Sequence, residues 1–184
     1  MFVEIRIHGR GGQGAVTAAN LLVTAALFEG KYGQAFPFFG AERRGAPVLA
    51  FARLSDKPIR IHSEIKEPDM VVVFDPTLFD LVDVLAGLKP GGKILVNSPE
   101  PIDVDGPYEV YYVDATRIAL GLKLVVAGWA LINTPMLGAM ARVLGSISIE
   151  SVVKAIKQNW SGRLGEVNAL AAEEAFKNVR RVEK

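Results

Sequence analysis

The sequence VEIRIHGRGGQGAV, residues 3–16, joins a strand-like segment to a glycine-rich turn and the start of a helix. Apolar and polar residues alternate from Val3 to Ile7, as in a strand with one buried face. Residues 15–28 are apolar or small on almost every side, and Gly30 can end this helix in a left-handed cap. A strand, a turn and a buried helix in this order predict the first unit of an α/β fold.

The turn matches the pattern G-x-G-x-x-G at Gly9, Gly11 and Gly14, in the strand-to-helix context that this motif requires. Backbone N–H groups at a helix N-terminus can bind phosphate, and Arg10 and Gln13 add side-chain donors. Close packing of the strand on the helix would also explain the glycines, so both interpretations stay open. The candidate turn comprises Gly9, Arg10, Gly11, Gly12, Gln13 and Gly14.

A dinucleotide-binding fold needs an acidic residue at the end of its second strand, where it binds the ribose hydroxyls. The corresponding segment here, KYGQAF at residues 31–36, contains no acidic residue, and Glu42 lies beyond it. The turn therefore fits a phosphate-bearing molecule other than a nicotinamide dinucleotide better. A free-standing NAD(P)-binding Rossmann reductase remains an alternative.

Further along the chain, apolar runs alternate with helical patterns. Met70 to Phe74 and Lys93 to Val96 resemble parallel strands covered on both faces, with a helix predicted between them at residues 77–88. Residues 108–113 predict another strand. A hairpin is predicted from residues 46–54 and 59–65, on either side of the turn Ser55-Asp56-Lys57-Pro58.

The last third of the chain is helical. Asn133 or Thr134 can cap a helix that Gly145 ends, and two more helical patterns follow at residues 149–160 and 167–179. Together these segments predict one domain over residues 1–184. Its expected fold is a three-layer α/β/α, Rossmann-like arrangement with a mostly parallel sheet and an antiparallel hairpin.

Composition narrows the function. The 21 basic and 20 acidic residues nearly cancel, so we expect no nucleic-acid partner and no attraction to a membrane surface. The longest apolar run, residues 124–132, is too short to span a bilayer, and the N-terminus lacks the pattern of a secretion signal, which favours the cytoplasm. The chain has no cysteine and so cannot ligate an iron–sulfur cluster. The positive mean hydropathy fits either an Ala- and Val-rich core or apolar faces buried against other subunits.

A second unusual segment, residues 34–48, combines the polar residues Glu42, Arg43 and Arg44 with aromatic ones. It can be a solvated turn with a surface ion pair, or a loop whose aromatic residues anchor a partner while a guanidinium binds phosphate or carboxylate. The aromatic residues are Phe36, Phe38 and Phe39.

Polar residues also follow the predicted parallel strands, where an α/β sheet binds ligands. Each could instead cap a helix, as the Asp75-Pro76 pair suggests. These residues are Asp75, Asn97, Ser98, Asp114 and Thr116. None of them is a clear general base or nucleophile, and His8, at a strand end, is better explained as structural.

The motifs HGRGGQG, AFPFFGAERRGAP, VVVFDP, LVNS and NTPMLG, in this order, resemble the gamma subunit of the 2-oxoacid:ferredoxin oxidoreductases, such as those for pyruvate and 2-ketoisovalerate. The resemblance covers the chain from about Ile5 to Leu144. It implies a multisubunit enzyme of anaerobic metabolism that converts a 2-oxoacid, here expected to be pyruvate, to acyl-CoA by oxidative decarboxylation.

The resemblance also implies a division of labour. Thiamine diphosphate, Mg²⁺ and [4Fe-4S] clusters belong to alpha, beta and delta partner subunits, and ferredoxin accepts the electrons. The gamma subunit helps to bind coenzyme A and contains no complete active site. A purely architectural subunit without ligand contact is a further alternative.

Carried over to this sequence, the resemblance places the turn from Gly9 to Gly14 against coenzyme A. Glu42, Arg43 and Arg44 would lie near a subunit junction, and Asn133, Thr134 and Met136 would form a second wall.

Overall fold

The predicted first strand is β1, Phe2–Arg10, which lies inside a seven-stranded sheet in the computed structural model; the structure describes residues 1–38 and 43–183. The strand order is β2-β3-β1-β4-β5-β6-β9. Strands β1, β4, β5 and β6 are parallel, whereas β3 is antiparallel to β1 and β2, and β9 to β6. The other strands are β2 Tyr32–Pro37, β3 Pro47–Ser55, β4 Met70–Val73, β5 Lys93–Asn97, β6 Glu109–Val113 and β9 Arg180–Arg181.

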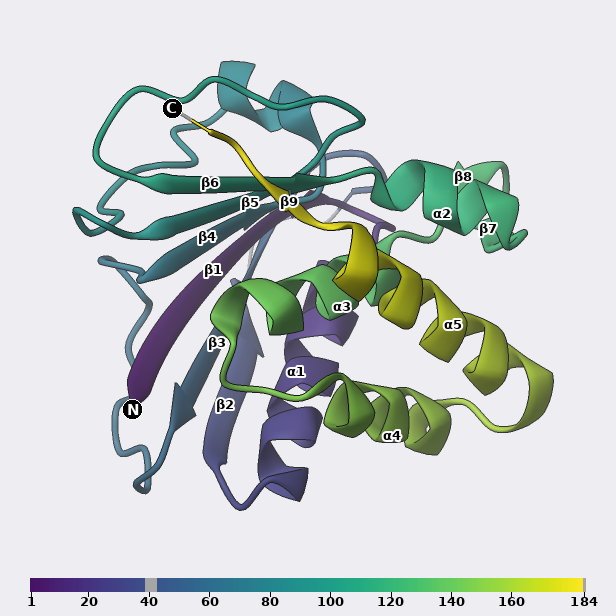
Figure 1. Ribbon diagram of the computed structural model, residues 1–184. Coiled ribbons are helices and arrows are strands. Elements are labelled where there is room, and N and C mark those ends of the chain that lie inside the picture. Colours follow the sequence, from purple (N-terminus) through teal and green to yellow (C-terminus); the bar gives the residue numbers. More distant parts are fainter. Residues whose placement is uncertain (39–42, 184) are drawn as a thin grey trace.

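The long helices lie on one side of this sheet, as Figure 1 shows. They are α1 Ala15–Phe28, α3 Asn133–Leu144, α4 Ile149–Asn159 and α5 Gly162–Asn178. A shorter helix, α2 Ala115–Gly121, leads into a small hairpin of β7, Val125–Val126, and β8, Trp129–Ala130. Among the described residues no helix is long and apolar enough to cross a membrane.

Two hydrophobic cores lie on opposite faces of the sheet. The larger one joins Ile5 and Ile7 of β1 to the helices, including Leu22 and Met136. The smaller one joins the alternate residues of β4, such as Val71, to turns rather than to a helical layer. The mixed α/β fold with an antiparallel hairpin is therefore confirmed, and the hairpin is the β2–β3 pair.

The hairpin predicted from residues 46–54 and 59–65 is wrong in its second strand. Residues 59–65 form no strand, because β1 and β2 already occupy both edges of β3. The segment is instead fixed to that part of the sheet by side chains. The carbonyl oxygen of Ser63 accepts a hydrogen bond from Arg53 at 2.6 Å, and Ile65 is buried.

The helix predicted at residues 77–88 is also wrong. Only a 3₁₀ turn, η1, forms at Pro76–Asp80, and turns follow it. The carbonyl oxygens of Val84 and Ala86 accept hydrogen bonds from the Arg6 guanidinium, which holds these turns against β1. Gly87 has a φ of 71°, a value that does not occur inside an α-helix. It also packs tightly on the backbone of Lys66.

The predicted caps have mixed outcomes. Asp75 caps η1 and Asp114 caps α2, each through a carboxylate that accepts a backbone N–H. Neither Asn133 nor Thr134 caps α3, because the helix already begins at Asn133 and its N-cap residue, Ile132, has no side-chain cap. Gly145 ends α3 in the left-handed conformation, as predicted.

Candidate functional site

The glycine turn connects the end of β1 to the start of α1. Gly14 is the N-cap residue of α1 with a φ of 81°, and Gly12 has a φ of 94° and is exposed. Among the described residues, the N–H groups of Gly12 and Gly14 have no hydrogen-bond acceptor. The first intrahelical bond is donated by Ala18, so the first turn of α1 adds further unpaired N–H groups. The turn thus presents donors at the positive end of a helix dipole.

Arg10 is held by the protein itself. Its Nε donates to Asp75 at 2.6 Å, its Nη1 to the carbonyl of Gly45 at 2.9 Å and its Nη2 to the hydroxyl of Thr77 at 2.6 Å. Burial alone would raise the pKa of Asp75, but the bonds from Thr77 and Arg10 outweigh it and lower this pKa below its usual value. The carboxylate therefore stays ionised, and Arg10 ties the turn to the end of β4.

Gln13 closes the turn from within. Its side-chain oxygen accepts the N–H of Arg10 at 2.7 Å, and its own N–H donates to the carbonyl of Arg10 at 3.0 Å. Arg10 is thus a side-chain donor, as the sequence predicted, whereas the side chain of Gln13 acts in the turn as an acceptor.

The loop before β3 lies against this turn. The N–H of Gly11 donates to Ala46, and the carbonyl of Gly11 accepts from Gly45 at 3.0 Å. A Cβ atom on Gly11 would lie 2.3 Å from the carbonyl oxygen of Arg43, so only glycine allows this approach. Arg43 and Arg44 are exposed here, whereas Glu42 and Phe39 lie outside the described residues.

The hairpin β7–β8 completes a small cavity beside the turn. The Arg44 guanidinium lies 5.7 Å from the centre of the Trp129 ring, a cation–π distance, and donates to the carbonyl of Ala127 at 3.4 Å. The cavity has a volume of about 170 Å³. Its lining residues are Gly11, Gly12, Arg44, Val126, Ala127, Trp129 and Leu131.

Trp129 is the residue of this site that the sequence analysis missed. It lies in the apolar run at residues 124–132, from whose length the sequence predicts only that the run is too short to span a bilayer. The signal was the Ala127-Gly128 pair between β-branched and aromatic residues, which is a hairpin pattern. Both residues have positive φ values, 50° and 84°, as such a turn requires.

Of the three residues predicted to form a second wall, Asn133, Thr134 and Met136, only Asn133 contacts the turn. The side chain of Asn133 packs on Gly14, where an added Cβ would lie 2.8 Å from its Nδ2. Thr134 and Met136 are fully buried, and the Thr134 hydroxyl donates to Asn168 of α5 at 2.8 Å. The structure therefore brings Arg44 and Asn133 to the turn and buries Thr134 and Met136 in the core.

His8 and Arg6 lie on the sheet face opposite the helices. The Nε of Arg6 donates to the Nε2 of His8 at 3.0 Å. Burial and then the charge of Arg6 lower the pKa of His8 to about 3. The imidazole is therefore neutral at physiological pH, which agrees with the structural role expected for it.

This lowered pKa predicts how stability depends on pH. Between pH 6.5 and about 3 the unfolded chain binds a proton that the folded chain excludes, so His8 makes the protein less stable as the pH falls through this window. The loss over the whole window is about 5 kcal/mol, of which about 3 kcal/mol falls above pH 4. In the variant His8→Gln, an amide oxygen can still accept from Arg6, and this part of the acid destabilisation should disappear. Urea unfolding of both proteins from pH 7 to pH 4 measures the difference, and parallel curves would contradict the prediction.

The mixed sheet and the glycine-rich turn between β1 and α1, with the exposed Arg44 beside it, define an α/β protein with a glycine-rich strand-to-helix turn. The chain belongs to the pyruvate ferredoxin/flavodoxin oxidoreductase family, whose model matches residues 4–178. Within this family it is a gamma subunit of a pyruvate/2-oxoacid ferredoxin oxidoreductase, as the resemblance in the sequence predicted.

Two known proteins support this assignment, and a third shares the fold. The pyruvate/ketoisovalerate oxidoreductases common subunit gamma of Thermococcus kodakarensis is 57% identical over 180 residues, which cover 95% of each chain. The crystal structure of pyruvate oxidoreductase subunit PORC from Thermotoga maritima has a TM-score of 0.85 and 37% identity, over 99% of both chains. The 2-oxoglutarate:ferredoxin oxidoreductase from Magnetococcus marinus, solved with 2-oxoglutarate, coenzyme A and succinyl-CoA, shares the fold alone. Its TM-score is 0.78 at 19% identity, over 96% of this chain and 31% of that one.

Proposed function

We propose that this subunit binds coenzyme A and positions its thiol for the conversion of a 2-oxoacid, pyruvate in the first place, to acyl-CoA by oxidative decarboxylation. The observation that carries the proposal is the cavity where the glycine turn, Arg44 and Trp129 meet. Coenzyme A carries a diphosphate, a 3′-phosphate and an adenine. The glycine turn and Arg44 can bind phosphate groups, and Trp129 can stack on the adenine.

The anionic part of coenzyme A fits the turn. The unpaired N–H groups of Gly12 and Gly14 and the first turn of α1 can donate to phosphate oxygens. Arg43 and Arg44 are exposed beside them and can form charge-assisted bonds. In this proposal Arg10 and Gln13 keep the turn in shape, and Asn133 supports it from the start of α3.

The adenine fits Trp129. This side chain is 49% exposed, which is unusual for a tryptophan outside a binding surface. Its ring already lies near the Arg44 guanidinium, and an aromatic base could stack on the indole in the same way. The Magnetococcus marinus enzyme that shares this fold was solved with coenzyme A and succinyl-CoA bound, which supports coenzyme A as the ligand in this proposal.

The remaining chemistry is assigned to other subunits. Thiamine diphosphate with Mg²⁺, held by alpha and beta subunits, would supply the decarboxylation chemistry when bound, and [4Fe-4S] clusters on partner subunits, delta among them, would pass electrons to ferredoxin. This chain has no cysteine for a cluster, so its residues bind and orient the substrate that receives the acyl group. The apolar hairpin, with Val126 58% exposed, would also contact a partner subunit and help assembly.

The double variant Arg43→Ala/Arg44→Ala tests the binding role. Removing two exposed charge-assisted donors should raise the KM for coenzyme A of the assembled enzyme about tenfold or more. The KM for the 2-oxoacid should stay unchanged, because that site lies on other subunits. Steady-state kinetics with each substrate varied in turn measure both values.

Arg60→Ala is the matched control. Arg60 is also an exposed arginine, but it follows the far end of β3, at the opposite end of the sheet from the turn. This variant should keep the wild-type KM for coenzyme A. An unchanged KM in the double variant, with the complex still assembled, would favour the purely architectural alternative.

The fold argues against the NAD(P)-binding alternative. In a dinucleotide-binding fold the second strand is the parallel neighbour of the first, and its end carries the ribose contact. Here the antiparallel β3 lies between β1 and β2, so the end of β2 is displaced from the glycine turn. Titration of the isolated chain with NAD(H) and NADP(H) should show no micromolar binding.

A further inference from the structure

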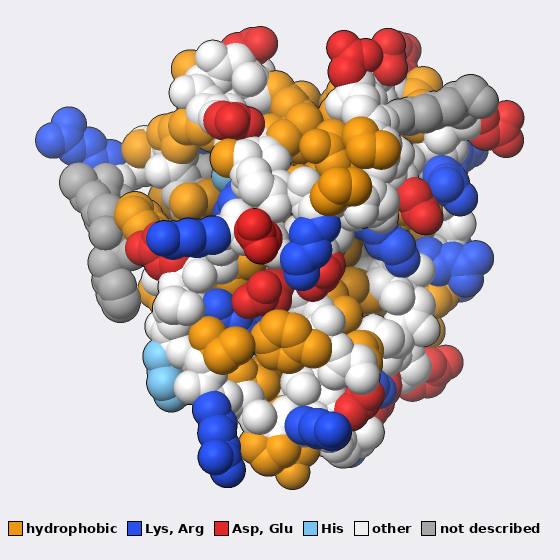
Figure 2. Space-filling model, turned by 90° about the vertical axis from the view of Figure 1, so that its left-hand side faces the viewer, with side chains coloured by type: hydrophobic (Ala, Val, Ile, Leu, Met, Phe, Trp, Pro, Cys, Tyr) orange, Lys and Arg blue, Asp and Glu red, His pale blue; other side chains and the backbone are white. Residues whose placement is uncertain are grey.

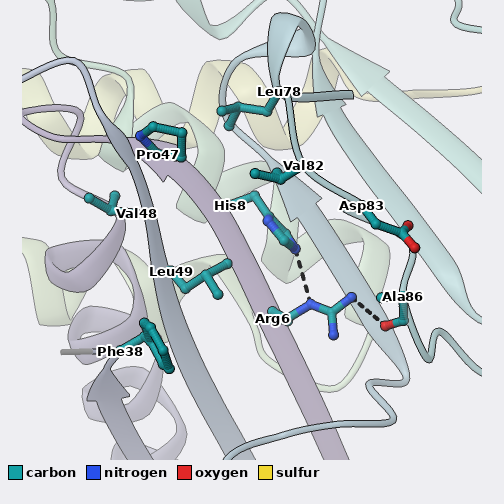
Figure 3. Close-up of a pocket in the computed structure, with 11 residues that line it drawn as sticks. Arg6, His8, Phe38, Pro47, Val48, Leu49, Leu78, Val82, Asp83 and Ala86 are labelled. Atoms are coloured by element: carbon teal, nitrogen blue, oxygen red, sulfur yellow. Dashed lines mark hydrogen bonds between the residues drawn. The ribbon is translucent and has the colours of Figure 1, made fainter. Parts of the chain in front are cut away.

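The sheet face opposite the helices contains a second cavity that the proposed coenzyme A site does not use. It has a volume of about 400 Å³ and lies between β1, β3 and the turns after η1 (Figure 3). It shares no lining residue with the cavity beside Trp129. Its size falls within the range of small-molecule pockets, which are apolar with a few polar groups.

The polar end of this cavity is the guanidinium of Arg6, which is only 6% exposed. Its Nε donates to His8, and its Nη2 donates to the carbonyls of Val84 and Ala86 at 3.0 and 2.6 Å. The third nitrogen, Nη1, has no acceptor among the described residues, and Figure 3 shows it without a bond. A buried cation that keeps a free donor in a cavity can bind an anionic oxygen.

The other walls are apolar. Leu49 of β3 faces Leu78 and Val82 across the cavity, whereas the neighbouring Val48 points to the other face of the sheet and packs against the larger core. Val82 is 37% exposed and Phe38 is 44% exposed, so apolar surface continues to the mouth. Figure 2 shows, from the side away from α5, hydrophobic side chains exposed among charged ones. Such a wall selects a ligand with an apolar body.

Asp83 limits the charge of the ligand. Its carboxylate lines the same cavity and interacts electrostatically with Arg6. The Oδ1 atom of Asp83 accepts a hydrogen bond from the N–H of Leu85 at 3.2 Å. A second negative charge on a ligand would meet this carboxylate, so dianions such as phosphate are disfavoured. The Arg6 guanidinium can bind one anionic group of a ligand, and the rest of that ligand must be uncharged.

We propose that this cavity is a binding site for a small monocarboxylate with a short apolar chain, held by the free nitrogen of Arg6 and by the apolar walls from β3 and the turns after η1. The site is independent of the proposed coenzyme A site, and it can therefore be tested without coenzyme A.

The test uses the full chain and three probes: 4-methylpentanoate, the neutral 4-methylpentan-1-ol and inorganic phosphate. Ligand-observed NMR titration should show saturable binding of 4-methylpentanoate, with the alcohol and phosphate at least about tenfold weaker. Equal binding of the acid and the alcohol, or no saturable binding of the acid, would overturn the proposal.

Two neighbouring substitutions locate the binding without disturbing Arg6. Val82→Phe places a larger ring in the cavity and should reduce binding of 4-methylpentanoate at least about tenfold. Leu81→Phe makes a similar change at the adjacent exposed residue, which does not line the cavity, and should bind like wild type. Equal behaviour of the two variants would place the probe elsewhere and contradict the assignment.

Asp83→Asn adds a test in the opposite direction. Its amide oxygen can still accept from Leu85, while the repulsion on a carboxylate disappears, so binding should tighten a few-fold. Weaker binding in this variant would mean that the ligand needs the carboxylate, which excludes a simple monocarboxylate.

The titration is then repeated with the assembled enzyme. Loss of binding there would show that a partner subunit fills the cavity and would also overturn the proposal.

Discussion

Replacing Gly138 by alanine is expected to destabilise the protein by about 3 kcal/mol, the upper end of the range for overpacked interiors. Gly138 lies in the middle of α3, where alanine normally favours a helix by about 1 kcal/mol. Here a Cβ would lie 1.9 Å from the carbonyl oxygen of Ala172 in α5. That oxygen belongs to the backbone, so the two helices must move apart.

The consequence would reach beyond this contact. Helix α5 also carries Asn168, which accepts the hydrogen bond from Thr134 at the start of α3. Separating the helices would stretch this buried bond and disturb Asn133, which packs on the glycine turn. The free energy of unfolding from urea titrations measures the main effect.

Gly121→Ala is the matched control, because it is also a helical glycine. Gly121 is exposed in α2, and an added Cβ would have no neighbour within 4 Å. This variant should be neutral or up to about 1 kcal/mol more stable. Equal effects of the two substitutions would show that helix propensity, and not the approach of α3 to α5, controls stability at Gly138.

The parts of the fold that the sequence predicts well are those set by local pattern. The helix expected at residues 15–28 has these same bounds in α1, because the glycine turn before it and Gly30 after it limit it on both sides. The strands β4 and β5 were recognisable since both of their faces are buried, which requires a continuous apolar run.

The two wrong elements fail for a tertiary reason. Residues 77–88 have a helical pattern, but they form successive turns whose carbonyl oxygens, at Val84 and Ala86, accept hydrogen bonds from the Arg6 side chain, far away in sequence. Residues 59–65 alternate like a strand, but β3 has no free edge for them. Neither competing interaction can be read from the segment itself.

The candidate site shows the same limit. The sequence motif predicts the glycine turn and its backbone donors. The hydrogen bonds from Arg10 to Asp75 and Gly45, however, depend on how the turn, the end of β4 and the loop before β3 meet in the fold. Trp129 joins the site only because the β7–β8 hairpin folds back over Arg44. A residue type can be predicted as suitable for a ligand, but its neighbours decide whether it is free to bind one.

Gly11→Ala should have the largest effect on the proposed coenzyme A site. A Cβ at this position would lie 2.3 Å from the carbonyl oxygen of Arg43, so the loop before β3 must move away. The bonds that join Gly11 to Ala46 and Gly45 would break, and Arg44 would lose its place beside Trp129. We expect the KM for coenzyme A in the assembled enzyme to rise more than tenfold, at a stability cost of about 2 kcal/mol.

A second readout separates the structural claim from the functional one. Hydrogen exchange at the Gly45 and Gly11 amides should become faster in the variant, whether or not coenzyme A binds here. Gly45→Asn serves as the control, since Gly45 has a φ of 81°, which asparagine tolerates, and open space around its Cβ position. It should keep slow exchange at Gly11 and a near-normal KM. If Gly11→Ala speeds exchange but leaves the KM for coenzyme A unchanged, the loop contact is real and the ligand binds at another place.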